Sequence, residues 1–176
     1  MRPLRLRDWR DLESILMSER KWLEPWEATV PGGSRLLDVK GMVRSLLRQH
    51  REGSALACVI EVDSKIVGQV NVANILYGSV SSGSTGYWIS EKYAGRSITP
   101  TAVALISDYM FNQMRLHRVE IAIRPENEAS LRIVEKLGFR FEGLKERYIH
   151  INGDWRDHKI FALTRDEARK EVTSGL

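Results

Sequence analysis

The hydrophobic period of the chain changes along its length, and this change most constrains the fold. Up to about residue 53, apolar residues recur every three or four positions, as on one face of a helix; from Ala55 many alternate or run continuously, as in strands. Helical spacing returns at 98–114 and 127–137, and strand-like segments follow each time. The expected order is β α α β β β α β α β β. It predicts a mixed β-sheet with helical crossovers, in an α/β (α+β) layer structure.

Capping and turn residues sharpen this prediction. Asp8 precedes an amphipathic helix and is expected to cap it. Gly138 is expected to end the last helix, and Asn152-Gly153 is a strong β-hairpin signal. The predicted strands are 4–7, 56–62, 65–72, 86–90, 119–123, 141–150 and 157–163. One predicted helix follows Asp8, and three more cover 36–50, 98–114 and 127–137. Loops are expected at 22–26 and 77–86.

Length and composition exclude several classes of protein. The 176 residues suffice for one core, so we expect a single domain over 1–166 with a polar tail at 167–176. No run of about 18 apolar residues is present to span a membrane, and the basic start lacks the apolar region of a signal peptide. The single Cys58 can form neither an internal disulfide nor a zinc site. A cytoplasmic protein is therefore expected.

The charge pattern points to a mixed, solvated surface. The chain has 27 Lys and Arg against 23 Asp and Glu, a net charge of +4 and a pI near 9.3. Its basic residues are scattered among acids, as at 145–147. The balance permits an acidic partner, but predicts no specific nucleic acid.

Most common catalytic signatures are absent. His50, His117, His150 and His158 lack metal-ligand spacing, so no metal is expected. Neither Gly-x-Ser-x-Gly nor a phosphate-binding Gly-x-x-x-x-Gly-Lys motif occurs. Cys58 alternates within a predicted strand, which favours a buried structural thiol. No nucleophile is paired with a base, so an acyl-enzyme is not expected.

Two segments are candidates for a site. The loop before helix 98–114 leads small residues and Arg96 into a helix N-terminus, whose free N–H groups suit a phosphate. Thr99 followed by Pro100 also fits an ordinary capped helix start, an equally good interpretation. At the second segment, Asn127 is placed to cap a helix and Ser130 lies in its first turn. Both side chains would point into a cleft at the strand end, or Asn127 only caps and Ser130 faces solvent.

Together, three segments resemble the GNAT superfamily of acetyl-CoA-dependent N-acetyltransferases, and within it the RimJ/RimL-type ribosomal-protein N-terminal (alanine) acetyltransferases. They are Trp22-Leu-Glu-Pro-Trp26, Asn127 through Phe139, and Asn152 through His158, within a likeness that runs from Leu4 to about Asp166. The resemblance implies a splayed sheet of about seven strands, flanked by about four helices, that holds acetyl-CoA between strands 87–90 and 119–123.

The resemblance also implies how acetyl-CoA is held. The backbone of Trp88, Ile89 and Ser90 would pair with the pantetheine amides, as an added strand pairs with a sheet edge. Asn127 would bond the pantetheine arm, and Arg132 and Lys136 would reach the nucleotide phosphates. The implied cofactor-binding set is completed by Gly95, Arg96, Ser97, Ile98 and Thr99 around the pyrophosphate, and by Ser130.

The phosphate loop departs from the family pattern. Its expected leading Arg or Gln, its middle Gly and its final small residue are replaced by Ala94, Ser97 and Thr99. The Cβ of Ser97 disfavours a positive φ, and Pro100 lacks an amide donor. We therefore expect weakened affinity for acetyl-CoA, unless the hydroxyls of Ser97 and Thr99 donate hydrogen bonds in compensation.

The mechanism that follows is direct attack of a primary amine on the thioester. An α-amine, with a pKa of about 7.7–8.0, is partly neutral near pH 7, whereas lysine, at about 10.4, needs a dedicated base. This favours a protein N-terminus as the acceptor. Val134 stands where many members carry a general-acid tyrosine, so Ser130, beside Asn127, is the substitute.

Other residues are assigned with alternatives. The candidate bases are Glu24, Glu120 and Asp157, and each could equally form a salt bridge or a turn. Trp22, Trp26 and Trp155 are expected to line the acceptor groove, or to be buried in the core.

The partner would be the N-terminus of a ribosomal protein, or the ribosome, with the chain a monomer or homodimer. Two other functions stay open. One is acetylation of a small amine such as an aminoglycoside or polyamine, which the scarcity of acids in the N-terminal region disfavours. The other is a non-enzymatic, ribosome- or RNA-associated module that keeps a degenerate acetyl-CoA fold.

Overall fold

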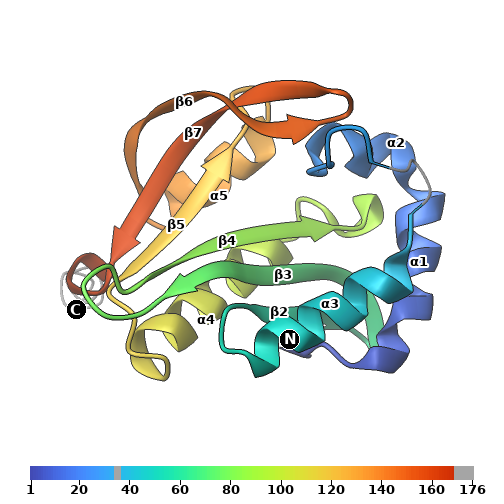
Figure 1. Cartoon of the computed structure of the whole chain (residues 1–176), viewed down its shortest axis with the longest axis horizontal. Helices are drawn as coiled ribbons and strands as arrows, with labels where there is room; N and C mark the ends of the chain where they lie inside the picture. Colours follow the sequence, from blue (N-terminus) through green and yellow to red (C-terminus); the bar gives the residue numbers. More distant parts are fainter. Residues whose placement is uncertain (34–36, 169–176) are drawn as a thin grey trace.

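The computed structural model describes residues 1–33 and 37–168. One seven-stranded sheet of order β1-β2-β3-β4-β5-β7-β6 forms the centre of the molecule (Figure 1). The strands are β1 (Arg2–Pro3), β2 (Leu56–Val62), β3 (Lys65–Leu76), β4 (Ser82–Ile89), β5 (Arg118–Ile123), β6 (Arg140–Ile151) and β7 (Asp154–Thr164). The α-helices are α1 (Trp9–Ser18), α2 (Arg20–Leu23), α3 (Val39–Arg51), α4 (Ile98–Asn112) and α5 (Glu128–Lys136). The predicted α/β class is confirmed.

The helices cover opposite faces of the sheet. Helices α1 and α3 pack on the N-terminal strands through a cluster around Leu12, Val39 and Val59. Helices α4 and α5 close the main core on the other face, around Met110, Ile121 and Val134. The C-terminal half of the sheet, β5-β7-β6, therefore has one face without a helix of the α1–α3 layer (Figure 1).

The sheet divides between β4 and β5. All other neighbours are antiparallel, whereas β4 and β5 are parallel and pair only from Ser82↔Arg118 to Ser84↔Glu120. Beyond these three pairs the two strands separate (Figure 1). The predicted splay between the strands that contain Tyr87 and Ile121 is confirmed.

The N-terminal segment differs from its prediction. The strand expected at 4–7 is wrong: β1 is Arg2–Pro3, and Leu6–Asp8 forms a 3₁₀ turn. Asp8 does not cap α1 with its side chain. The side chain is buried and accepts hydrogen bonds from the Arg5 N–H at 2.7 Å and the Arg2 guanidinium at 2.7 Å. A buried carboxylate needs a charged partner more than a helix end needs a cap, which explains the difference.

Other boundaries also moved. The loop expected at 22–26 contains the end of α2 and a 3₁₀ turn at Glu24–Trp26. The loop expected at 77–86 is shorter, because β4 begins at Ser82. A Cβ on Gly83 would lie 2.8 Å from side-chain carbons of both Met110 and Val72, so close packing explains the glycine at this position. The helix predicted at 36–50 begins later, at Val39. Leu36 itself, and residues 169–176 of the tail predicted at 167–176, lie outside the described residues.

Candidate active site

The β4 edge that faces β5 is an open row of backbone groups. The Ser90 N–H donates to the Val67 carbonyl on β3 at 2.7 Å. Because the backbone groups of successive residues in a strand point to opposite sides, those of Tyr87 and Ile89 point away from β3, toward the separated β5. The Ile89 carbonyl accepts the Trp22 indole N–H at 2.9 Å. This edge can pair with an extended ligand.

The strand geometry changes the predicted set of backbone contacts. The Ser90 carbonyl accepts the Tyr93 N–H at 2.9 Å, so both backbone groups of Ser90 are used within the protein. Trp88 faces β3 by the same alternation. In this geometry the backbone groups of Trp88 and Ser90 face β3, whereas those of Ile89 face the opening; the predicted ligand contacts of all three residues stay a prediction. Tyr87 was missed, although strand alternation could have identified it once the pairing with β3 was known.

The loop before α4 presents free N–H groups. Gly95 has φ +73° and Ser97, the N-cap residue, has φ +58°. No hydrogen bond among the described residues uses the N–H of Gly95, Arg96, Ser97 or Ile98. These donors stand at the positive end of a 15-residue helix, an arrangement that suits a phosphate.

The side chains around this loop are placed differently from the prediction. Thr99 is not the N-cap: it is buried within the first turn of α4. Arg96 is exposed and its guanidinium lies 5.5 Å from the centre of the Tyr93 ring. Lys136 is exposed on α5, and Arg132 forms an exposed ion pair with Glu128 at 3.6 Å, a contact of little energetic weight.

Ser97→Gly tests the strained position of this loop. A non-glycine residue at positive φ costs about 1–2 kcal/mol, so the glycine variant is expected to raise the thermal midpoint and to bind coenzyme A about 2–5-fold more tightly. Thermal unfolding and calorimetric titration with coenzyme A measure both effects. Ser97→Ala, which keeps the Cβ, is the control; equal affinity in both variants would contradict the account.

Asn127, Ser130 and Tyr87 meet where the strands separate. The Asn127 Oδ1 accepts the Ser130 N–H at 3.1 Å, so the predicted cap is confirmed and the Asn127 NH₂ stays free of other described residues. The Tyr87 hydroxyl is buried, has no hydrogen bond of acceptable geometry among the described residues, and lies near the Ser130 hydroxyl. Burial raises the pKa of Tyr87 to about 12, which nearby Ser130 only partly opposes. Tyr87 is therefore a neutral donor at pH 7.

Two variants of Asn127 separate its cap from a ligand contact. Asn127→Ala should destabilise the chain by about 1 kcal/mol through loss of the cap. Asn127→Asp keeps the cap acceptor but loses the NH₂ donor, so stability should hold while affinity for coenzyme A falls about 10-fold. Chemical denaturation and calorimetry measure the two effects. Unchanged affinity in the aspartate variant would show that Asn127 only caps.

The three candidate bases differ in how they are engaged. Glu120 pairs with Arg118 at 2.7 Å, and Asp157 accepts the Arg147 N–H at 2.7 Å, where β6 bulges. Both therefore have the structural roles that the sequence left open. Glu24 is half-buried and forms no ion pair or hydrogen bond within 1–33 and 37–168 through its side chain. Val134 is fully buried in the core.

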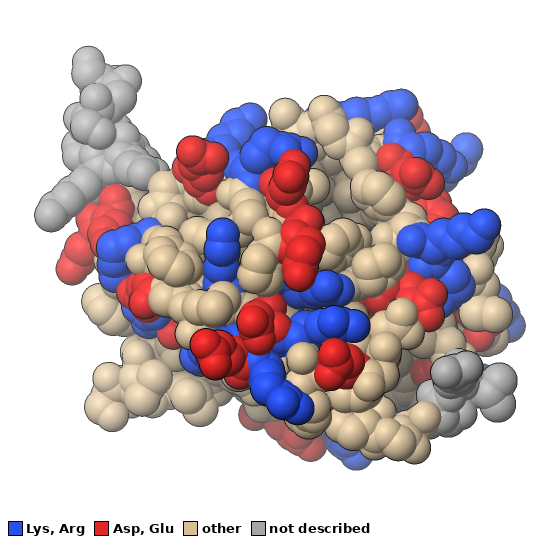
Figure 2. Space-filling view, turned by 90° about the horizontal axis from the view of Figure 1, so that it is seen from above, with Lys and Arg blue, Asp and Glu red and all other residues tan. Residues whose placement is uncertain are grey.

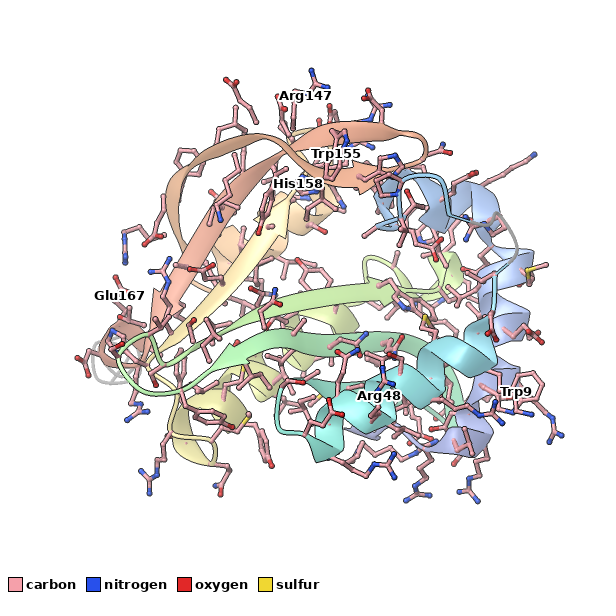
Figure 3. The ribbon with its side chains drawn as sticks, viewed as in Figure 1. Trp9, Arg48, Arg147, Trp155, His158 and Glu167 are labelled. Atoms are coloured by element: carbon pink, nitrogen blue, oxygen red, sulfur yellow. The ribbon has the colours of Figure 1, made fainter. Side chains whose placement is uncertain are left out.

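The tryptophans gather at the end of the sheet where β4 and β5 are farthest apart. Trp26 is 38% exposed beneath the Arg124 guanidinium, and Trp155 is 44% exposed on the β6–β7 hairpin (Figure 3). A bridge between Ala28 and Ile151 joins the two segments. Trp22 packs in the α1–α3 core and reaches the opening only with its indole N–H. Trp26 and Trp155 thus flank one end of the opening.

The charge distribution and the candidate metal ligands of the described residues point to no further chemistry at this site. The face over β6 and β7 interleaves Lys and Arg with Asp and Glu rather than gathering one sign (Figure 2). Among the described residues, no group of three His, Cys, Asp or Glu side chains could hold a metal ion. None of the described helices is long and apolar enough to cross a membrane.

The comparison with known families agrees with this geometry. The acetyltransferase (GNAT) domain model matches residues 1–140. The chain belongs to the GNAT acetyltransferase family. It is therefore an acyltransferase, and its sheet separates between the two strands that the resemblance implied.

Its relatives include N-acetyltransferases that act on a ribosomal protein or on spermidine. The chain is 32% identical to the [ribosomal protein uS5]-alanine N-acetyltransferase of Escherichia coli over 89% of this chain and 81% of that one. It is 36% identical to the probable N-acetyltransferase YjcK of Bacillus subtilis, but there spans only 56% of the relative's length and 57% of its own. It is 28% identical to the E. coli spermidine N(1)-acetyltransferase over 89% of this chain and 81% of that one.

A solved structure is similar along nearly the whole chain. Mycobacterium smegmatis RimJ in complex with CoA-disulfide superposes with a TM-score of 0.87 and is 34% identical, covering 99% of this chain and 88% of that one. The fold is therefore one that holds coenzyme A in a related protein.

Proposed function

We propose that the protein transfers the acetyl group of acetyl-CoA to the N-terminal α-amine of a protein, with a ribosomal protein as the preferred acceptor. The observation that carries this proposal is the unpaired edge of β4 opposite β5, beside a loop of free amides. The similarity to the uS5-alanine acetyltransferase and to RimJ supports a protein N-terminus as acceptor.

The residues present fit acetyl-CoA. The open backbone groups of Tyr87 and the Ile89 N–H would pair with the pantetheine amides, and the Asn127 NH₂ would donate to the same arm. The N–H groups of 95–98 would hold the pyrophosphate. Arg96, Arg132 and Lys136 would add positive charge from the exposed rim.

The acceptor would enter at the other end of the opening, between Trp26 and Trp155. Two partly exposed aromatic side chains give an apolar wall to a flexible N-terminal peptide. Its amine nitrogen attacks the acetyl carbon directly. Ser130, with the neutral Tyr87 hydroxyl beside it, would donate a hydrogen bond to the departing thiolate sulfur.

The test is acetylation of paired peptides. A peptide with a free N-terminal alanine and one internal lysine is incubated with the protein and acetyl-CoA, beside the same peptide with a blocked N-terminus. Mass spectrometry should place the acetyl group on the α-amine of the first and find none on the second. Acetylation of the lysine in both peptides would contradict the proposal.

Spermidine is the second candidate acceptor, because of the similarity to a spermidine acetyltransferase. A polyamine with several cations needs acidic partners. Two acids near the acceptor end, Glu24 and Glu27, are half-buried, and Glu27 already forms an ion pair with Arg20. Competition between spermidine and the alanine peptide distinguishes the two candidates: spermidine should inhibit only at concentrations far above the peptide.

A further inference from the structure

His158 is a buried histidine at the edge of the proposed acceptor site. It is 4% exposed and lies on β7 one position beyond the Ile123↔Lys159 pair, which is the last pair between β5 and β7. It therefore flanks the turn that leads from β5 to Asn127. Figure 3 shows it near Trp155, at the end of β5.

One hydrogen bond fixes which ring nitrogen carries the proton. The His158 Nδ1 lies 3.0 Å from the Arg156 carbonyl oxygen. A carbonyl oxygen can only accept, so Nδ1 is the donor and the neutral ring keeps its lone pair on Nε2. Nε2 makes no hydrogen bond with another described residue, and it is not among the fully buried atoms that lack a partner. The lone pair on Nε2 is therefore partly accessible from outside the protein.

The environment keeps this ring neutral at pH 7. Burial lowers the pKa of His158, and the positive charge of Arg124 acts in the same direction. The bond to the Arg156 carbonyl and the charges of Glu126 and Asp157 only partly oppose these effects. The groups around the ring are Arg124 and Glu126 from the turn after β5, Lys145 and Tyr148 from β6, and Arg156 and Asp157 from β7 itself.

We propose that Nε2 of His158 is the general base that removes the proton from the acceptor amine. This role rests on the proposed acetyl transfer to an amine. Two of the other candidate bases already have partners: the Glu120 carboxylate pairs with Arg118, and the Asp157 carboxylate accepts the Arg147 N–H. Glu24 has no such engagement, and its variant serves as the competing test below.

The step moves one proton from the acceptor nitrogen to the leaving sulfur by way of His158. The neutral amine forms a C–N bond to the acetyl carbon, and the thioester C=O becomes an oxyanion. Nε2 takes one proton from the positively charged nitrogen, the C–S bond breaks as C=O re-forms, and the thiolate leaves. The imidazolium then returns that proton, through solvent, to the thiolate. A weakly basic imidazole suits this order, because the nitrogen of the intermediate is far more acidic than a free ammonium group.

His158→Asn is the direct test. The Asn amide can still donate to the Arg156 carbonyl, but it carries no basic nitrogen. With any amine that the wild type acetylates, kcat should fall about 100-fold or more, while KM for acetyl-CoA stays within about twofold. The residual rate should keep rising above pH 8 with hydroxide, whereas the wild type levels off once the α-amine is neutral. His117→Asn, an exposed histidine at the other end of β5, is the matched control and should keep wild-type kcat.

A second measurement does not depend on the fold of the variant. Nitrogen NMR of the wild-type imidazole should show a neutral ring protonated at Nδ1 at pH 7. An imidazolium there, or a His158→Asn variant with kcat within threefold of wild type, would overturn the proposal, as would a loss of kcat confined to Glu24→Gln. If the wild type acetylates neither peptides nor spermidine, the proposed function fails first and the role of His158 falls with it.

Discussion

Ser130→Ala is expected to lower kcat about 100-fold while KM for acetyl-CoA changes less than about twofold. The Ser130 hydroxyl lies at the N-terminus of α5 near the buried Tyr87 hydroxyl, and Val134 cannot replace it as a donor. Its hydrogen bond gains strength only as negative charge develops on the sulfur, so its loss should reduce kcat rather than binding. Steady-state kinetics with the alanine peptide measures both constants.

Ser130→Thr is the matched variant, because it keeps a hydroxyl at the same position. It should recover most of the rate lost in the alanine variant. Tyr87→Phe then separates the two donors: a further loss of kcat would place Tyr87 in the same hydrogen-bond chain. Wild-type kcat in Ser130→Ala would remove Ser130 from the mechanism.

Asp8→Ala is expected to lower the free energy of unfolding by about 2–3 kcal/mol. The carboxylate is 2% exposed and bonds the Arg2 guanidinium at 2.7 Å, while Arg2 also pairs with Glu61 at 2.9 Å. Removing the acid leaves a partly buried guanidinium with fewer partners; the 20% exposure of the Arg2 side chain moderates the cost. Urea denaturation at pH 7 measures it. Asp11→Ala removes an exposed acid in the first turn of α1 and should change stability by less than about 0.5 kcal/mol.

The same ion pair predicts a dependence on pH. Burial alone would raise the pKa of Asp8, but the hydrogen bonds from Arg2 and the Arg5 N–H outweigh it, and the pKa is lowered. Folding therefore gains stability from Asp8 above the unfolded pKa of about 3.9, and loses it as the pH falls through the lower folded pKa. Wild type and Asp8→Ala should approach equal stability in acid; a constant difference at every pH would contradict this account.

Local signals in the sequence were sufficient for much of the fold. Asn152-Gly153 forms the β6–β7 turn with φ values of +49° and +87°, and Asn127 caps α5, because both depend on residues close in the chain. The predicted side-chain cap at Asp8 failed because Arg2 and the Arg5 N–H bind this carboxylate, and Arg2 is in turn held by Glu61 on the distant strand β2. Packing of Gly83 against Met110 similarly concealed the start of β4.

The residues of the site were easier to predict from the sequence than the side of the strand to which their backbone groups point. The family resemblance placed the opening between the correct strands, but which backbone groups of β4 face it depends on the register with β3. Ser97 was recognised as unfavourable at positive φ, and it adopts φ +58°. His158 lay in a segment singled out by resemblance, yet its free Nε2 depends on a contact of Nδ1 with the Arg156 carbonyl that the residue pattern does not show.

Amide hydrogen exchange with and without coenzyme A tests the central claim most directly, that an extended ligand completes the open edge of β4. In the free protein, the Tyr87 and Ile89 amides should exchange quickly and the Ser90 amide, bonded to Val67, slowly. Coenzyme A should then protect Tyr87 and Ile89 and leave Ser90 unchanged. Slow exchange at Tyr87 and Ile89 in the free protein, or no added protection on binding, would contradict the account.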